Sequence, residues 1–175
     1  MKPSQERVES NAIVKEWAKH VTGDVLSIGS AGDLDKQGGR YRDYFIRAKT
    51  YTTSDVEYTA GCDLTLDVRR MPLIRDCSFN GLFCSGVLEH VDRYQDAISE
   101  MWRVLRPNGV LLLGVPFMQP EHRRPNDFKR WTQDGIRYDL TRMGSKFDVE
   151  EIRPVGDPTR ALAYWVRARK VTKTL

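Results

Sequence analysis

The sequence predicts an α/β fold: a doubly wound, mostly parallel seven-stranded sheet with helices on both faces and an antiparallel last strand. Three stretches carry this prediction. VLSIGSAGD (25–33) is an apolar run that ends in a glycine, as a buried parallel strand entering a tight turn does. VLLLGVPF (110–117) is apolar throughout, which is typical of a strand buried on both faces. ALAYWVRARK (161–170) alternates as an antiparallel strand does, and a helix is the alternative there because alanine and arginine favour helices.

The remaining elements follow from periodicity and from residues that end helices. Residues 1–23 are expected to form an N-terminal helix that covers the sheet, with Ser4 as its N-cap, Trp17 on its buried side and Gly23 after its end. Further strands are expected at 50–54, 62–66, 79–84 and 147–153, and further helices after Asp92, which with Gln95 forms a capping-box pattern, and after Thr132. YRDYFIRA (41–48) has a short helical pattern, and residues 107–109 are expected to form a turn before the 110–117 strand. The helix after Thr132 is expected to include Met143 and to end at Gly144. The longest irregular segment, 117–131, is expected to be an active-site loop.

Length and composition favour one domain spanning 1–175. The net charge of +4 is modest and indicates a solvated surface rather than a nucleic-acid site. MKPSQERVES has no signal-peptide core and no apolar run approaches the ~20 residues that span a bilayer, so a cytoplasmic protein without a membrane partner is expected. Cys62, Cys77 and Cys84 lack CxxC spacing, so we expect packing residues and no disulfide or metal site.

Two turns are placed to form a nucleotide-type site. Gly29 and Gly32 follow the first strand, where glycine lets a ligand approach the backbone. Asp55 ends the second strand, where a carboxylate accepts hydrogen bonds from both hydroxyls of a ribose. Glu57 is the second choice for this role, and the alternative is that Asp55 only caps a loop.

Two further strand ends add polar groups to the same edge. Asp67 is placed to accept from an adenine amino group while Val68 offers its backbone N–H. Asp67 is equally placed to pair with Arg69 or Arg70. Ser85 follows the fourth strand, at the edge where open α/β sheets bind ligands.

Several motifs, in this order, resemble those of one family: VLSIGSAGD, the acid in YTTSDVE, LDVRRMPL, SFNGLFCSGVLEHV and WRVLRPNGVLLLGVPF. The chain resembles the class I S-adenosylmethionine-dependent methyltransferases, specifically the type 11 group. HRRPNDFKRWT (122–132) is similar to a stretch found in a subset of the family, several of which act on small molecules or sugars.

The resemblance implies a cofactor, S-adenosyl-L-methionine, and a role for each residue around it. Its methionine portion would lie against Gly29, Ser30, Ala31 and Gly32. Asp55 would bind the ribose, Asp67 and Val68 the adenine, and Ser85 would lie beside the sulfur. The implied activity is methyl transfer to an oxygen or nitrogen of a small-molecule acceptor such as a sugar or natural product.

The long loop supplies the candidate catalytic residues His122, Asp127 and Arg130. His122 and Asp127 could act as a base or orient an acceptor hydroxyl, and the loop's arginines suit an acidic acceptor group. The alternative for Asp127 and Arg130 is an internal ion pair that shapes the loop. His90, which follows Glu89, is interpreted as a structural hydrogen-bonding residue.

Departures from the family pattern keep other functions open. Ser27 stands where the family usually has an acid and Ala31 where it has a glycine, so a catalytically inert cofactor-binding or partner subunit is one alternative. An NAD-dependent oxidoreductase is disfavoured because Leu34 occupies the third glycine position of G-x-G-x-x-G. Nucleic-acid methylation is disfavoured because the Asn/Asp-Pro-Pro-aromatic motif is absent. A homodimer is compatible with the sequence.

Overall fold

The computed structural model describes residues 4–30, 32–58, 61–142 and 146–171. Its strands are β1 (Gly23–Ile28), β2 (Ala48–Asp55), β3 (Leu64–Thr65), β4 (Phe79–Ser85), β5 (Leu105–Pro116), β6 (Phe147–Val155) and β7 (Ala163–Lys170). Its helices are α1 (Gln5–Ala18), α2 (Tyr94–Val104) and α3 (Gln133–Arg142), with 3-10 turns η1 (Tyr41–Tyr44) and η2 (Leu88–His90). None of these helices is long and apolar enough to cross a membrane.

The seven strands form one sheet in the order β3-β2-β1-β4-β5-β7-β6. β1 pairs in parallel with both β2 and β4, and β5 extends the parallel part of the sheet. β7 runs antiparallel to both β5 and β6, so residues 163–170 are a strand and not a helix. The expected fold class is therefore confirmed, including the antiparallel last strand.

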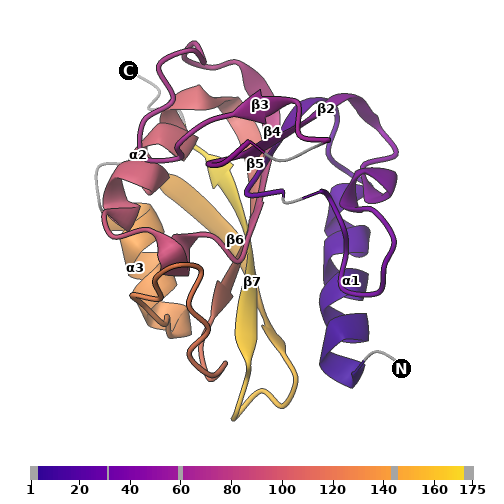
Figure 1. Ribbon diagram of the computed structural model, residues 1–175, viewed down its shortest axis with the longest axis vertical. Coiled ribbons are helices and arrows are strands. Elements are labelled where there is room, and N and C mark those ends of the chain that lie inside the picture. The colour runs from indigo at the N-terminus through magenta and orange to yellow at the C-terminus, as the bar shows by residue number, and fades with distance from the viewer. Residues whose placement is uncertain (1–3, 31, 59–60, 143–145, 172–175) are drawn as a thin grey trace.

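The helices cover opposite faces of the sheet, with α1 on one side and α2 and α3 on the other (Figure 1). Neighbouring strand residues alternate between the two layers: Val25 packs with Trp17 of α1, whereas Leu26 packs with Ile98 and Met101 of α2. Trp165 of β7 is buried in the α1 layer and donates from Nε1 to Ser10 Oγ of α1 at 2.9 Å. This bond ties the N-terminal helix to the sheet.

Regular alternation of strands and helices does not extend across the first half of the chain. Between β1 and β2 the only described helical element is the 3-10 turn η1, and loops connect β2 to β3 and β3 to β4. The polar LDKQGG stretch (34–39) is stabilised by local contacts, since Asp35 accepts from the backbone N–H groups of Gln37 and Gly39. These loops leave the carboxyl edge of the sheet open for a ligand.

Three local expectations need correction. The Asp92/Gln95 capping box does not form, because α2 begins at Tyr94. The Asp92 carboxylate instead accepts hydrogen bonds from the Arg69 side chain and from the Arg93 N–H. Residues 107–109, expected as a turn before the fifth strand, lie within β5, where Asn108 has φ +61°. Cys77 is exposed rather than packed. The expected α3 residues Met143 and Gly144 lie outside the described part of the chain.

Candidate functional site

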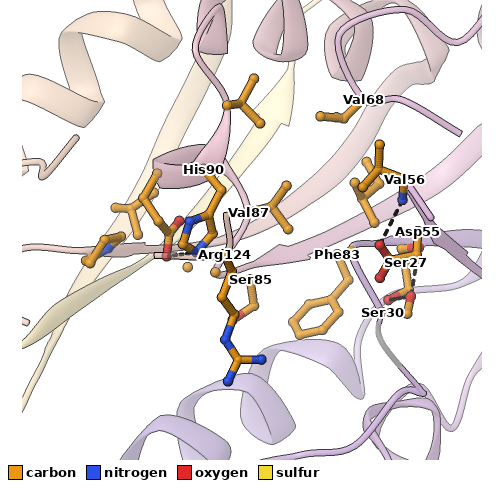
Figure 2. A pocket seen from close by; sticks show the side chains of 18 of the residues that line it. Ser27, Ser30, Asp55, Val56, Val68, Phe83, Ser85, Val87, His90 and Arg124 are labelled. Carbon is orange, nitrogen blue, oxygen red and sulfur yellow. Dashed lines mark hydrogen bonds and ion pairs between the residues drawn. The ribbon is translucent and has the colours of Figure 1, made fainter. Parts of the chain in front are cut away.

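The carboxyl ends of β1, β2, β4 and β5 open into one cavity of about 830 Å³. The start of β7 borders the same space because this strand runs in the opposite direction. In Figure 2, Ser27, Ser30 and Asp55 lie on one side, His90 and Arg124 lie on the other, and Ser85 and Phe83 lie between them. An open α/β sheet binds its ligands at this edge.

The turn after β1 is built from hydroxyl groups. The Ser30 hydroxyl lies 2.8 Å from the Ser27 hydroxyl and 3.0 Å from the Ser27 carbonyl oxygen, to which the Ser54 hydroxyl also donates. Ser27, which stands where the family usually has an acid, is buried, and its hydroxyl contacts the turn through Ser30 while its backbone carbonyl accepts from Ser54 of β2. Gly29 adopts φ +68°, and a Cβ built there would lie 2.3 Å from Val87 Cγ2. Glycine is therefore required at position 29, because the backbone has a positive φ and because Val87 leaves no room for a Cβ.

Gly29 and Asp55 lie side by side. Ile28 pairs with Ser54 in the parallel ladder, so the next residue of each strand reaches the sheet edge at the same level, and the Ser30 N–H donates to the Ser54 carbonyl at 2.9 Å. Both Gly29 and Asp55 line the cavity. The Asp55 carboxylate accepts from the Val56 N–H at 2.8 Å, which fixes its orientation at the end of β2.

Asp67 and Val68 also line the cavity, with Val68 buried. The Asp67 carboxylate accepts from Arg69 Nη2 at 2.6 Å and from the Arg69 N–H at 2.9 Å. Hydrogen bonds from Arg69 hold the pKa of Asp67 below its ordinary value. Arg69 also bonds to Asp92, at the loop before α2. The Asp67–Arg69 pair that the sequence offered as an alternative is therefore present, and Asp67 also lines the cavity.

The other expected cofactor residues differ in position. Ser85 lines the middle of the cavity. It packs against Gly114, on which a Cβ would lie 3.1 Å from the Ser85 Oγ. Gly32 is not among the lining residues, and Ala31 lies outside the described residues. Sequence reasoning missed Asp33, which is buried in the cavity wall and has a positive φ of +62°. Its carboxylate accepts hydrogen bonds from the Tyr51 hydroxyl and from the Arg42 side chain. The sequence did contain a signal for this residue, because Asp33 is an acidic residue directly after Gly32.

Asp127 and Arg130 form an ion pair inside the 117–131 loop. Arg130 donates from both Nη atoms to the two carboxylate oxygens of Asp127, whose side chain is 1 % exposed. The same guanidinium bonds to the carbonyls of Gln119 and Pro120, and Asp127 accepts from the His122 N–H at 2.7 Å. The Arg130 hydrogen bonds hold the pKa of Asp127 far below its ordinary value. Neither side chain is among those lining the cavity, so their positions favour shaping the loop over direct catalysis.

His122 does line the cavity, where it meets two residues that follow β4. Its Nε2 lies 3.7 Å from Glu89 Oε1, and the His90 Nε2 lies 4.0 Å from the same oxygen. The two imidazole rings are perpendicular, with centroids 5.1 Å apart. Glu89 is buried, and this burial raises the pKa of its carboxyl. The sequence does not indicate this cluster, because Glu89 and His90 alone do not have metal-ligand spacing and His122 lies in a loop far along the chain.

The last residues of the loop attach it to the rest of the domain. Phe128 donates its N–H to the Glu89 carbonyl at 2.7 Å. The buried Trp131 donates from Nε1 to Asp139 of α3, which also pairs with Lys129. The loop is thus held across the open edge of the sheet, over the side of the cavity that His90 and Arg124 line.

Comparison with known proteins agrees with this architecture. A family model described as a methyltransferase domain matches residues 43–113. No curated protein sequence matches the chain. The match covers β2 to β4 and most of β5, and so includes the strand ends that carry Asp55 and Ser85.

Solved structures share the fold over nearly the whole chain. N-methyltransferase NodS from Bradyrhizobium japonicum has a TM-score of 0.72 at 17% identity, covering 98% of this chain and 100% of that chain. The Burkholderia thailandensis 1,6-didemethyltoxoflavin-N1-methyltransferase, solved with its substrate and S-adenosylhomocysteine, has a TM-score of 0.70 at 19% identity, covering 96% and 79%. The [4+2]-cyclase SpnF has a TM-score of 0.68 at 14% identity, covering 94% and 80%. The expected resemblance to class I methyltransferases is confirmed.

Proposed function

We propose that this chain, in which residues 43–113 match a methyltransferase-domain model and whose fold is shared by solved methyltransferases, binds S-adenosylmethionine and transfers the methyl group to a small-molecule acceptor. The observation that carries the proposal is the adjacent placement of Gly29 and Asp55 on one cavity. Bound S-adenosylmethionine supplies an electrophilic methyl group on a sulfonium. Methyl transfer to a positioned acceptor depends mainly on orientation and on exclusion of water.

The residues present fit this cofactor. The Asp55 carboxylate suits a ribose diol because an ionised carboxylate offers paired acceptors. Beside it, the buried Val68 and the side chain of Val56 give apolar surface for a flat base. On the other side of Ser85 the wall changes to His90, His122 and Arg124, which suits a polar acceptor.

The same geometry disfavours a dinucleotide. A pyrophosphate is held at the N-terminus of the helix that follows the first strand. Among the described residues between β1 and β2, the only helical element is the four-residue turn η1, so no such helix is present there. Structural neighbours act on different atoms, since two are N-methyltransferases and one is a cyclase, so the acceptor atom is left to experiment.

Calorimetric titration with S-adenosylhomocysteine tests the proposal. We expect one equivalent to bind, and Asp55→Ala to weaken binding by about 10- to 100-fold, because a hydrogen bond to a charged group contributes about 1.5–3 kcal/mol. Glu57→Ala is the matched control, since Glu57 lines the same cavity two residues after Asp55, and it should bind as the parent does. An unchanged affinity in Asp55→Ala would contradict the proposal, as would binding of NAD in place of S-adenosylhomocysteine.

A second measurement distinguishes a transferase from an inert binding subunit, the alternative suggested by Ser27 at the position where the family usually has an acid. The protein is incubated with S-adenosylmethionine and a panel of small hydroxyl and amine acceptors, and S-adenosylhomocysteine formation is measured. Acceptor-dependent formation supports catalysis. Binding without turnover on any acceptor, beside an active reference methyltransferase, would favour the inert subunit.

A further inference from the structure

One cluster has the composition and geometry of a metal site. Glu89 and His90 belong to η2, directly after β4, and His122 comes from the 117–131 loop. One potential ligand atom from each residue lies within 4.8 Å of the other two. We propose that Glu89, His90 and His122 bind a divalent transition-metal ion of the zinc class at the acceptor side of the cavity.

The histidine tautomers favour metal binding. His90 Nδ1 lies 2.5 Å from the Asn126 carbonyl oxygen, and His122 Nδ1 lies 3.1 Å from the Pro120 carbonyl oxygen. A carbonyl oxygen can only accept, so each Nδ1 carries a proton and donates it. In a neutral ring the Nε2 then presents its lone pair, and both Nε2 atoms face Glu89. Metal-binding histidines are held by this kind of hydrogen bond on the second nitrogen.

Glu89 supplies the anionic ligand. Its side chain is 2 % exposed, and Oε2 is a buried oxygen with no hydrogen-bond partner among the described residues. Its other oxygen lies 3.7 Å and 4.0 Å from the two Nε2 atoms, beyond hydrogen-bonding distance. Three lone-pair-bearing atoms therefore face one another without a shared proton. A cation between them would satisfy all three, including the buried carboxylate.

The ligand set selects the kind of metal. Two imidazole nitrogens and one carboxylate are typical of Zn²⁺ and of Fe²⁺, Co²⁺ or Ni²⁺, whereas Mg²⁺ and Ca²⁺ prefer oxygen ligands. Ligands about 2 Å from a tetrahedral metal lie about 3.3 Å apart, so side-chain shifts of less than about 1 Å would close the site. Three protein ligands leave a coordination position for an exogenous group.

The location suggests what this open position holds. All three residues line the cavity that also holds Ser85, on the side away from Asp55. A metal there would bind a hydroxyl of the acceptor and lower its pKa, so that the hydroxyl gives its proton to solvent and the oxygen is ready to take the methyl group. This role rests on the proposed methyl transfer, whereas metal binding by the three residues does not.

Zn²⁺ titration of untagged, chelator-treated protein tests the site. We expect one equivalent to bind with a micromolar or lower dissociation constant and to raise Tm, and Mg²⁺ to do neither at the same concentration. His122→Ala should weaken Zn²⁺ binding at least about 100-fold and abolish the rise in Tm. His20→Ala is the control, since His20 is the other histidine of the chain and lies exposed after α1, and it should bind as the parent does.

A Co²⁺ titration gives a second readout that does not depend on stability. Bound Co²⁺ should show visible absorption bands in the parent and in His20→Ala, and these should be lost in His122→Ala and in Glu89→Gln. Unchanged Zn²⁺ affinity in folded His122→Ala, or no binding to the parent, would overturn the site. S-adenosylhomocysteine titration of the same samples distinguishes failure of the two proposals. Binding of S-adenosylhomocysteine without binding of Zn²⁺ overturns the metal site alone. Binding of Zn²⁺ without binding of S-adenosylhomocysteine overturns the proposed function alone.

Discussion

Gly29 packs against Val87 so closely that a Cβ built on Gly29 would lie 2.3 Å from Val87 Cγ2. The turn after β1 is therefore in direct contact with the loop after β4. We expect Gly29→Ala to lower the free energy of unfolding by about 2 kcal/mol or more. A positive φ costs an L-residue about 1 kcal/mol or more, and the clash adds to it. The substitution should also weaken S-adenosylhomocysteine binding, because Gly29 lines the cavity. Urea unfolding and calorimetry measure the two effects.

Two further variants separate the causes. Gly38→Ala has a similar φ of +91° but no atom within 4 Å of the new Cβ, so it should cost only the backbone strain and leave ligand binding unchanged. The double variant Gly29→Ala/Val87→Ala should recover part of the stability lost in the single variant, because the contacting methyl group is gone. If Gly38→Ala is as harmful as Gly29→Ala, the contact with Val87 does not matter.

Asp67 lies in the cavity wall and also pairs with Arg69, and the two roles predict different binding data. A carboxylate has about four acceptor positions, so Asp67 can bond to a ligand amino group while it is held by Arg69. We therefore expect Asp67→Asn to weaken S-adenosylhomocysteine binding about tenfold and Arg69→Ala to change it less than about threefold, by calorimetry. Equal losses in the two variants would mean that the pair only shapes the loop.

The strands and their ends were predictable because their signals are local. The apolar run before Gly29 and the acid at the end of β2 place two residues on neighbouring strands, and parallel pairing brings them together without any further information. Residues 110–116 and 163–170 likewise show their strands through hydrophobicity and alternation, whereas the start of β5 at 105–109 was not predicted.

The remaining features depend on tertiary contacts. Nothing local to Glu89 or His90 indicates that His122 will face them, because that approach is set by the Phe128–Glu89 backbone bond and by the course of the loop. Among the described residues between β1 and β2 there is no α-helix, and this was also not predictable, since Tyr41 and Tyr44 have helical spacing yet form only a 3-10 turn. Such turns are decided by packing more than by propensity.

The Asp127–Arg130 pair should control how rigid the 117–131 loop is. In Asp127→Asn, Arg130 loses its charged partner and the His122 N–H loses an anionic acceptor. We expect faster cleavage by trypsin after Arg123 and Lys129, because the loop opens more often. Glu121→Gln is the control, since it removes an exposed pair with Arg123 in the same loop and should leave the cleavage rate close to that of the parent. Equal rates in parent and Asp127→Asn would show that the pair does not hold the loop.

Glu100 of α2 should make stability depend on pH. Its carboxylate accepts from Arg103 and from the Met71 N–H at 2.6 Å, and so ties α2 to the loop that contains Asp67. The hydrogen bond from Arg103 lowers the pKa of Glu100 below its ordinary value of 4.5. A carboxyl whose pKa is lower in the folded state stabilises the protein above the pKa of the unfolded state and loses this contribution as the pH falls through the folded value.

We therefore expect Glu100→Gln to lower the free energy of unfolding by about 1–2 kcal/mol near pH 7, because hydrogen bonds to a charged group are lost. The difference from the parent should shrink as the pH falls below about 4.5, where the carboxyl of the unfolded parent takes up a proton, and should be lost once the pH is below the lowered pKa of the folded parent. Urea unfolding at the two pH values measures it. Asp96→Asn removes an exposed pair with Arg93 on the same helix and should change stability by less than about 0.5 kcal/mol at either pH. A Glu100→Gln difference that is constant across this range would show that the charge of Glu100 does not stabilise the fold.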